Sequence, residues 1–110
     1  AGRVFAWAKE LDPAAARRLA TLIFHSYFVH CLDIAQDKVL RACVSEAGLS
    51  WQAFEAARAE GTPAALLRRN VDASIERGVF GSPFFIVDGE PFFGLEKLPL
   101  LEEWLANGGW

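Results

Sequence analysis

A strand–turn–strand pattern near the C-terminal end limits the folds that are open to this chain. Phe84–Val87 is a continuous run of strand-forming residues, Asp88-Gly89 follows it, and a second short run occupies residues 90–93. An unbroken apolar run is typical of a strand covered on both faces, and Asp-Gly favours a tight hairpin turn. Pro91 cannot donate to a sheet, so the return strand is predicted to begin at an edge. Because two strands form no stable sheet alone, this hairpin is expected to need neighbours.

The residues before the hairpin have the three-to-four-residue apolar spacing of amphipathic helices. Asp12 and Ser50 are N-cap candidates for two of these patterns, and Gly48 stands where a left-handed C-cap is expected. In the second pattern, Tyr27 and Cys31 belong to the apolar stripe that is predicted to be buried. The predicted helices cover about 3–10, from 13 to about 31, 37–47, 51–60, 62–77 and, after the hairpin, 98–106.

Charge and hydropathy argue against two classes of partner. The 110-residue chain has 11 Lys and Arg against 14 Asp and Glu, a net charge of −3, with basic and acidic residues interspersed. The doublet Arg68-Arg69 is too short to follow a phosphate backbone, so a nucleic-acid partner is not expected. No apolar run approaches the ~20 residues of a membrane span. The first residues do not resemble a secretory signal, so a cytoplasmic location is expected.

The cysteines and histidines show no pattern typical of redox or metal chemistry. Cys31 and Cys43 form no CxxC motif. In a cytosolic protein they are expected to be reduced and buried, with a structural disulfide as the alternative. His25 and His30 are five residues apart, whereas a metal pair on one helix face needs four, and no metal site is expected.

A longer segment around the hairpin resembles the signature of a known family. It runs Gly78-Val79-Phe80-Gly81-Ser82-Pro83-Phe84-Phe85-Ile86-Val87-Asp88-Gly89-Glu90-Pro91-Phe92-Phe93-Gly94. This segment is similar to that of the 2-hydroxychromene-2-carboxylate isomerases, glutathione-dependent relatives of the kappa-class glutathione transferases. Residues 98–110 and the upstream Phe24-His25-Ser26-Tyr27-Phe28 with Asp33-Ile34 also resemble that family, so the likeness covers nearly the whole chain.

The resemblance implies an α/β fold in two parts. Residues 78–110 are expected to form the C-terminal half of a thioredoxin-like fold, as strand, hairpin and helix, and residues 1–77 an all-helical insertion domain. The family's catalytic serine lies just after the first strand of its fold, and no residue of this chain matches it. The resemblance therefore places no catalytic residue here. The chain is expected to start inside the helical insertion and to be inactive alone.

The resemblance also implies a binding site for glutathione. The proline of this fold is cis, so the resemblance predicts a cis Ser82-Pro83 bond that presents the main-chain N–H and C=O of Ser82 to the cysteinyl part of glutathione. Without the resemblance, Ser82-Pro83 is interpreted only as a turn into the strand. Leu95, Glu96 and Lys97 align with the segment that holds the γ-glutamyl end, where relatives usually have Asn or Ser, then Asp, then Arg. Each departure is expected to alter binding, and Glu96 could instead only complement the helix dipole.

A substrate pocket and a function follow from the same resemblance. The resemblance assigns Phe92 and Phe93 to the wall of a pocket for an aromatic substrate, whereas the usual burial of aromatic residues in so short a domain favours core packing as their role. The first hypothesis is a glutathione-dependent isomerase of aromatic degradation, or a kappa-class glutathione transferase, present here as a fragment. The alternatives are a thioredoxin-fold disulfide oxidoreductase, which needs a CxxC, and a non-catalytic truncated module.

The expected partners are glutathione, a small aromatic substrate and further copies of the chain. Phe84–Val87 is predicted to have an unpaired apolar edge, which favours association between chains. A dimer, another homo-oligomer or a strand-swapped assembly is therefore expected.

Overall fold

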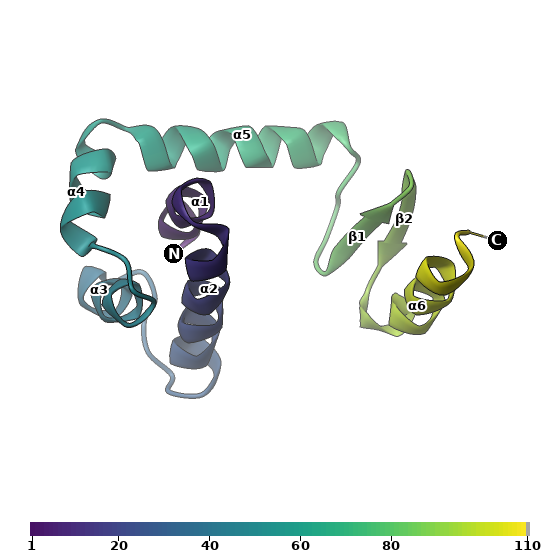
Figure 1. Cartoon of the computed structure of the whole chain (residues 1–110), viewed down its shortest axis with the longest axis horizontal. Helices are drawn as coiled ribbons and strands as arrows, with labels where there is room; N and C mark the ends of the chain where they lie inside the picture. Colours follow the sequence, from purple (N-terminus) through teal and green to yellow (C-terminus); the bar gives the residue numbers. More distant parts are fainter. Residues whose placement is uncertain (110) are drawn as a thin grey trace. The chain divides into compact units, whose positions relative to one another are not determined.

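The computed structural model describes residues 1–109, which form two compact units (Figure 1). The first unit is Ala1–Val71 and the second begins at Asp72. The boundary lies within α5 (Thr62–Glu76), which is shared by both units.

The first unit is all-helical. Its helices are α1 (Gly2–Leu11), α2 (Pro13–Phe28), α3 (Asp37–Glu46), α4 (Trp51–Ala59) and the first part of α5. Asp12 caps α2 by accepting from the main-chain N–H groups of Ala14 and Ala15, and Ser50 caps α4 by accepting from Ala53. Gly48 follows α3 with a φ of 86°, in the left-handed region that suits a C-terminal cap. The caps predicted from the sequence are thus confirmed.

The core of this unit is formed where the apolar faces of α1, α2, α3 and α4 meet. The Phe54 side chain is almost fully buried in this core, with its ring edge-on to Trp7 at 5.4 Å and tilted against Trp51 at 5.0 Å. The buried members are Val4, Trp7, Ala8, Ala16, Leu19, Ile23, Leu40, Cys43, Val44, Ala47, Trp51 and Phe54. Arg18 of α2 adds a polar link, because its Nε and Nη2 both donate to the carbonyl of Ala47 beyond the end of α3.

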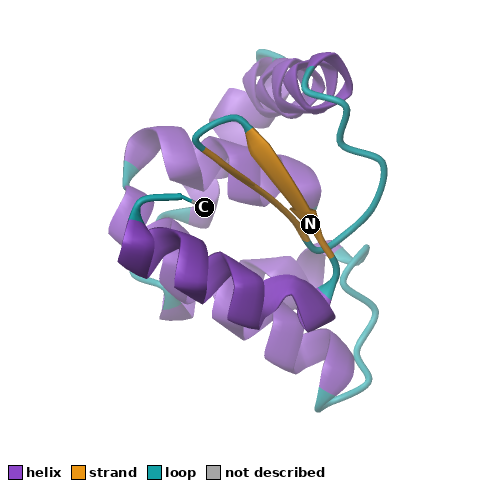
Figure 2. Cartoon of the chain, turned by 90° about the vertical axis from the view of Figure 1, so that its right-hand side faces the viewer, coloured by secondary structure: helices purple, strands orange, loops and turns teal. Residues whose placement is uncertain are grey.

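The second unit contains the hairpin and the last helix (Figure 2). β1 (Phe84–Val87) pairs antiparallel with β2 (Glu90–Phe93), with Phe84 opposite Phe93 and Val87 opposite Glu90. Asp88 and Gly89 connect them with φ values of 53° and 83°, the left-handed pair that a two-residue hairpin turn requires. A 3₁₀ turn, η1 (Leu95–Lys97), then leads into α6 (Leu98–Asn107), and the Trp104 indole of α6 donates to Asp88 at 3.0 Å.

The predicted strand, turn, return strand and helices are confirmed, with two corrections in detail. The second helix ends at Phe28, so Cys31 lies beyond it, and both Tyr27 and Cys31 are exposed rather than buried. Only Cys43 is buried, with its Sγ 3.4 Å from the Ser26 hydroxyl, and both cysteines are free thiols. The faces of β1 are only half-buried, since Ile86 is 37% exposed.

Among residues 1–109, every helix is too short or too polar to serve as a membrane span.

Candidate functional site

One main-chain hydrogen bond brings together the two segments that the resemblance assigns to glutathione. The amide of Gly94 donates to the carbonyl of Pro83 at 3.0 Å, one step beyond the last paired residues of the hairpin, Phe84 and Phe93. The ladder therefore continues past β1 and β2, and Ser82-Pro83 lies beside the start of η1. We call Ser82, Pro83 and Gly94–Lys97 the hairpin-base site.

Ser82 presents main-chain groups at this site. The Ser82–Pro83 peptide bond is cis, as the resemblance predicts, and Ser82 is exposed. Among the hydrogen bonds between described residues, neither the N–H nor the C=O of Ser82 has a partner. An exposed donor and acceptor on one residue can pair with an extended peptide-like ligand, as in the addition of a short strand.

Glu96 provides the negative charge of the site. Gly94 is buried with a φ of 94°, and a Cβ built on it would overlap the carboxylate of Glu96. The carboxylate therefore lies against the backbone of Gly94, the residue whose amide donates to Pro83. Leu95 is 67% exposed and Lys97, the N-cap residue of α6, is also exposed, so an anionic and a cationic side chain are both accessible here.

The two predicted pocket phenylalanines lie in different surroundings. Phe92 is 6% exposed and packs edge-on against Trp104 at 5.9 Å, inside the unit. Phe93 is 41% exposed, and its ring centroid is 4.9 Å from Phe80 and 6.2 Å from Phe84. We call Phe80, Phe84 and Phe93 the aromatic cluster.

Sequence reasoning did not identify the other two members of this cluster. The rings of Phe80 and Phe84 are 5.1 Å apart and nearly perpendicular, although cis-Pro83 separates the residues in the chain. Gly81 makes the arrangement possible, because a Cβ there would overlap the Phe93 ring. Gly81, which lies between Phe80 and Phe84, is the one local feature of the sequence that indicates this packing. It does not identify Phe93 as the third ring of the cluster.

The described residues contain no cluster typical of a metal centre. Within residues 1–109, no group of three or more His, Cys, Asp or Glu side chains is placed to hold an ion. The groups that the hairpin base presents are main-chain hydrogen-bonding groups, one carboxylate, one ammonium group and adjoining aromatic rings.

Comparisons with known proteins agree with this architecture. Residues 1–106 match the profile of the DSBA-like thioredoxin domain family. The chain is also 30% identical, over 102 residues, to a protein of Sphingobium xenophagum named 2-hydroxychromene-2-carboxylate isomerase. That alignment covers 92% of this chain and 51% of the relative, so the chain spans about half the length of the curated relative it matches.

Proposed function

The chain belongs to the DSBA-like thioredoxin domain family, and we propose that it supplies the glutathione-binding part of an isomerase acting on a small aromatic substrate. The observation that carries the proposal is the Pro83–Gly94 hydrogen bond, which joins the residue after Ser82 to the residue that begins the segment with Glu96 and Lys97. The name of the Sphingobium xenophagum relative supports the reaction class. Because the chain spans about half of that relative, the reaction is proposed for the whole protein.

The residues of the hairpin-base site fit the parts of glutathione. The unpaired N–H and C=O of Ser82 match the main chain of the cysteinyl residue. The exposed Glu96 carboxylate matches the γ-glutamyl ammonium group, and the exposed Lys97 matches a glutathione carboxylate. The chemistry that bound glutathione supplies is a nucleophilic thiol, and this chain's part is to bind and orient it.

Lys97 is expected to bind less specifically than the arginine that the resemblance places there. An ammonium group is a flexible point charge, whereas a guanidinium pairs with a carboxylate through two parallel hydrogen bonds. The main chain of Ser82 and the carboxylate of Glu96 therefore provide most of the orientation in this proposal.

The aromatic cluster is proposed to contact the substrate. It includes Phe93, which the resemblance assigns to the pocket, and exposed rings of this kind pack well on a planar aromatic compound. Phe92 is proposed to support this wall from inside through its contact with Trp104. The proposed setting is the cytoplasm, where the two free thiols of this chain would stay reduced.

A disulfide oxidoreductase has less support from the residues of this chain. Such an enzyme uses a pair of neighbouring thiols, and the sequence has no CxxC. Cys31 is exposed and Cys43 is buried, and no disulfide joins them.

Calorimetric titration of the 110-residue chain tests the proposed glutathione site. Glutathione should bind, and Glu96→Gln should weaken binding by roughly fivefold, the effect of about 1 kcal/mol expected for a solvent-accessible ion pair. Glutathione acetylated on its amino group lacks the matching charge, so its binding should not respond to Glu96→Gln.

Glu102→Gln is the matched control, because Glu102 is an exposed carboxylate of α6 that lies outside the hairpin-base site. It should leave the affinity for glutathione unchanged. Absence of binding, or equal losses for Glu96→Gln and Glu102→Gln, would contradict the proposal.

A further inference from the structure

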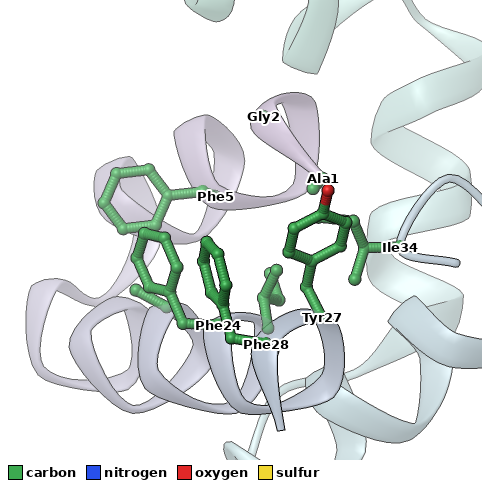
Figure 3. A pocket seen from close by; sticks show the side chains of 9 residues that line it. Ala1, Gly2, Phe5, Phe24, Tyr27, Phe28 and Ile34 are labelled. Atoms are coloured by element: carbon green, nitrogen blue, oxygen red, sulfur yellow. The ribbon is translucent and has the colours of Figure 1, made fainter. Parts of the chain in front are cut away.

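The helical unit contains an apolar groove that the proposed function does not use (Figure 3). It has a volume of about 420 Å³ and lies between α1 and α2. Phe5 of α1 lies on one side, the rings of Phe24, Tyr27 and Phe28 of α2 on the other, and Ile34 at one end. The volume falls within the range of roughly 300–1,000 Å³ typical of small-molecule pockets.

The aromatic rings of the groove are accessible to a ligand. Phe24, Tyr27 and Phe28 are 61%, 52% and 70% exposed, an unusual concentration of large apolar side chains on one helix face. The Phe24 and Phe28 rings stack at 6.1 Å with planes 20° apart, whereas Tyr27 meets Phe28 nearly perpendicularly at 4.8 Å. The groove thus offers both ring faces and ring edges, the two geometries in which aromatic groups pack favourably.

The groove has almost no polar character. Of the side chains lining it, that of Tyr27 is the only one with a nitrogen or oxygen atom, and none carries a charge. A carboxylate placed in such a groove loses hydration without gaining a partner, which is costly, whereas an uncharged ring system gains from burial.

We propose that this groove is a binding site for an uncharged, planar aromatic compound. The site lies wholly within the first unit, so it is separate in residues from the hairpin-base site. It goes beyond the proposed function, because neither glutathione nor a charged substrate fits its lining.

A pair of probes with the same rings tests the selectivity. Naphthalene-2-carboxamide is neutral and naphthalene-2-carboxylate is an anion of nearly the same shape. Both are titrated into the 110-residue chain, and the ring signals of Phe24, Tyr27 and Phe28 are followed by NMR. The amide should bind saturably and shift these signals, and the carboxylate should bind at least tenfold more weakly, with roughly tenfold corresponding to about 1.4 kcal/mol.

The titrations are run at about pH 9 to remove the charge of the N-terminal amino group. Ala1 lines the groove, and the pKa of its α-amino group is lowered from 8.0, first by burial and then by Arg3, against an opposing effect of Asp37. At about pH 9 this amine is neutral, so a preference for the amide reports on the side chains.

Two variants of the chain test whether the amide binds in the groove. Phe24→Ala combined with Phe28→Ala should reduce the affinity for the amide at least tenfold, and circular dichroism should be unchanged because both side chains are largely exposed. Leu11→Ala is the control, since Leu11 is 61% exposed on α1 and does not line the groove.

Three results would overturn the proposal. The first is no saturable binding of the amide by the folded chain. The second is equal affinity for the amide and the carboxylate, or an equal loss in the double variant and the control. The third is a shift of the same ring signals on dilution without ligand, which would assign the groove to contacts between copies of the chain.

Discussion

Gly94 links the backbone of the hairpin to the charge of the proposed glutathione site. Its φ of 94° lies in a region that side-chain-bearing residues rarely adopt, and the Glu96 carboxylate occupies the space of a Cβ. Any side chain at this position has to strain the backbone and displace the carboxylate.

Gly94→Ala should therefore lower the free energy of unfolding by about 1–3 kcal/mol and weaken glutathione binding. The measurement is urea unfolding followed by the NMR signal of the Trp104 indole. Gly78→Ala is the control, because Gly78 has a φ of 75° and an added Cβ there would meet nothing within 4 Å. Its cost should be about 1 kcal/mol, with glutathione binding intact. Equal effects of the two substitutions on binding would show that Glu96 does not depend on Gly94.

Local residue chemistry explains what could be predicted from the sequence at this scale. The caps at Asp12 and Ser50 and the Asp88-Gly89 turn depend on a few neighbouring residues, so the sequence predicts them well. Exposure of Tyr27 could not be predicted in this way. Apolar spacing identifies a helix face, but whether another element covers that face depends on the tertiary packing.

The contacts between elements depend on polar links that sequence patterns do not reveal. In the second unit, the Trp104 indole of α6 donates to Asp88 in the hairpin turn. In the first, Arg58 of α4 donates from both terminal nitrogens to Asp37 of α3, while its guanidinium lies over the rings of Trp51 and Phe54. The hydrogen-bonded pairs Trp104–Asp88 and Arg58–Asp37 are at least sixteen positions apart in the chain, so local residue spacing does not predict them.

Asp88 has two roles, since it accepts a hydrogen bond from the Trp104 indole and adopts a left-handed turn conformation, and two substitutions test these roles together. Asp88→Asn keeps both an oxygen for the indole and a residue that tolerates a φ of 53°, so stability should change little. Asp88→Ala loses both, and the free energy of unfolding should fall by about 1–3 kcal/mol. Urea unfolding monitored at the indole of Trp104 measures this difference, and equal stability of the two variants would contradict it.

The link between α3 and α4 should give the helical unit a pH-dependent stability. The hydrogen bond from Arg58 is the main cause that lowers the pKa of the Asp37 carboxyl from 3.8; burial opposes it, and the charges of Arg58 and Arg41 assist. A carboxyl whose pKa is lower in the folded state stabilises the fold above its unfolded-state pKa, and this contribution is lost as the pH falls through the folded-state value.

Asp37→Asn should accordingly lower the urea midpoint at about pH 7, and this effect should become smaller as the pH falls through the folded-state pKa of Asp37, where the carboxylate gains a proton and loses its charge. Glu46→Gln is the control on the same helix, because Glu46 is an exposed residue at the end of α3. It should not reproduce this pH dependence. A loss for Asp37→Asn that stays constant across this pH range would rule out the ionic contribution.

For the molecule as a whole, β1 is the element through which copies of the chain are expected to associate. Within the described residues, β1 pairs only with β2. Its four residues are apolar, whereas natural sheet edges are usually protected by charges or proline. We propose that β1 mediates pairing between copies of the chain.

Sedimentation velocity should show concentration-dependent association of the 110-residue chain. Ile86→Lys places a charge on β1 at a side chain that is 37% exposed, and should shift the chain toward monomer. Ile75→Lys in α5 changes a 67% exposed side chain away from the strand and should not. A chain that stays monomeric at every concentration, or equal effects of the two lysines, would contradict this.

The fold class was predictable because the hairpin and helix patterns are strong and the resemblance supplies their arrangement. The match of residues 1–106 to the thioredoxin-type family confirms it. The groove between α1 and α2 was not predictable, since it is formed by residues from two helices and a loop whose spacing is that of ordinary amphipathic elements.

Glutathione titration of the ¹⁵N-labelled chain, followed by its main-chain amide signals, is the decisive experiment for the hairpin-base site. We expect saturable shifts at Ser82, Gly94, Glu96 and Lys97, and unchanged signals in α1–α4. Glutathione that leaves these four amides unaffected, or that shifts only residues of the helical unit, would show that the hairpin base is not a glutathione site.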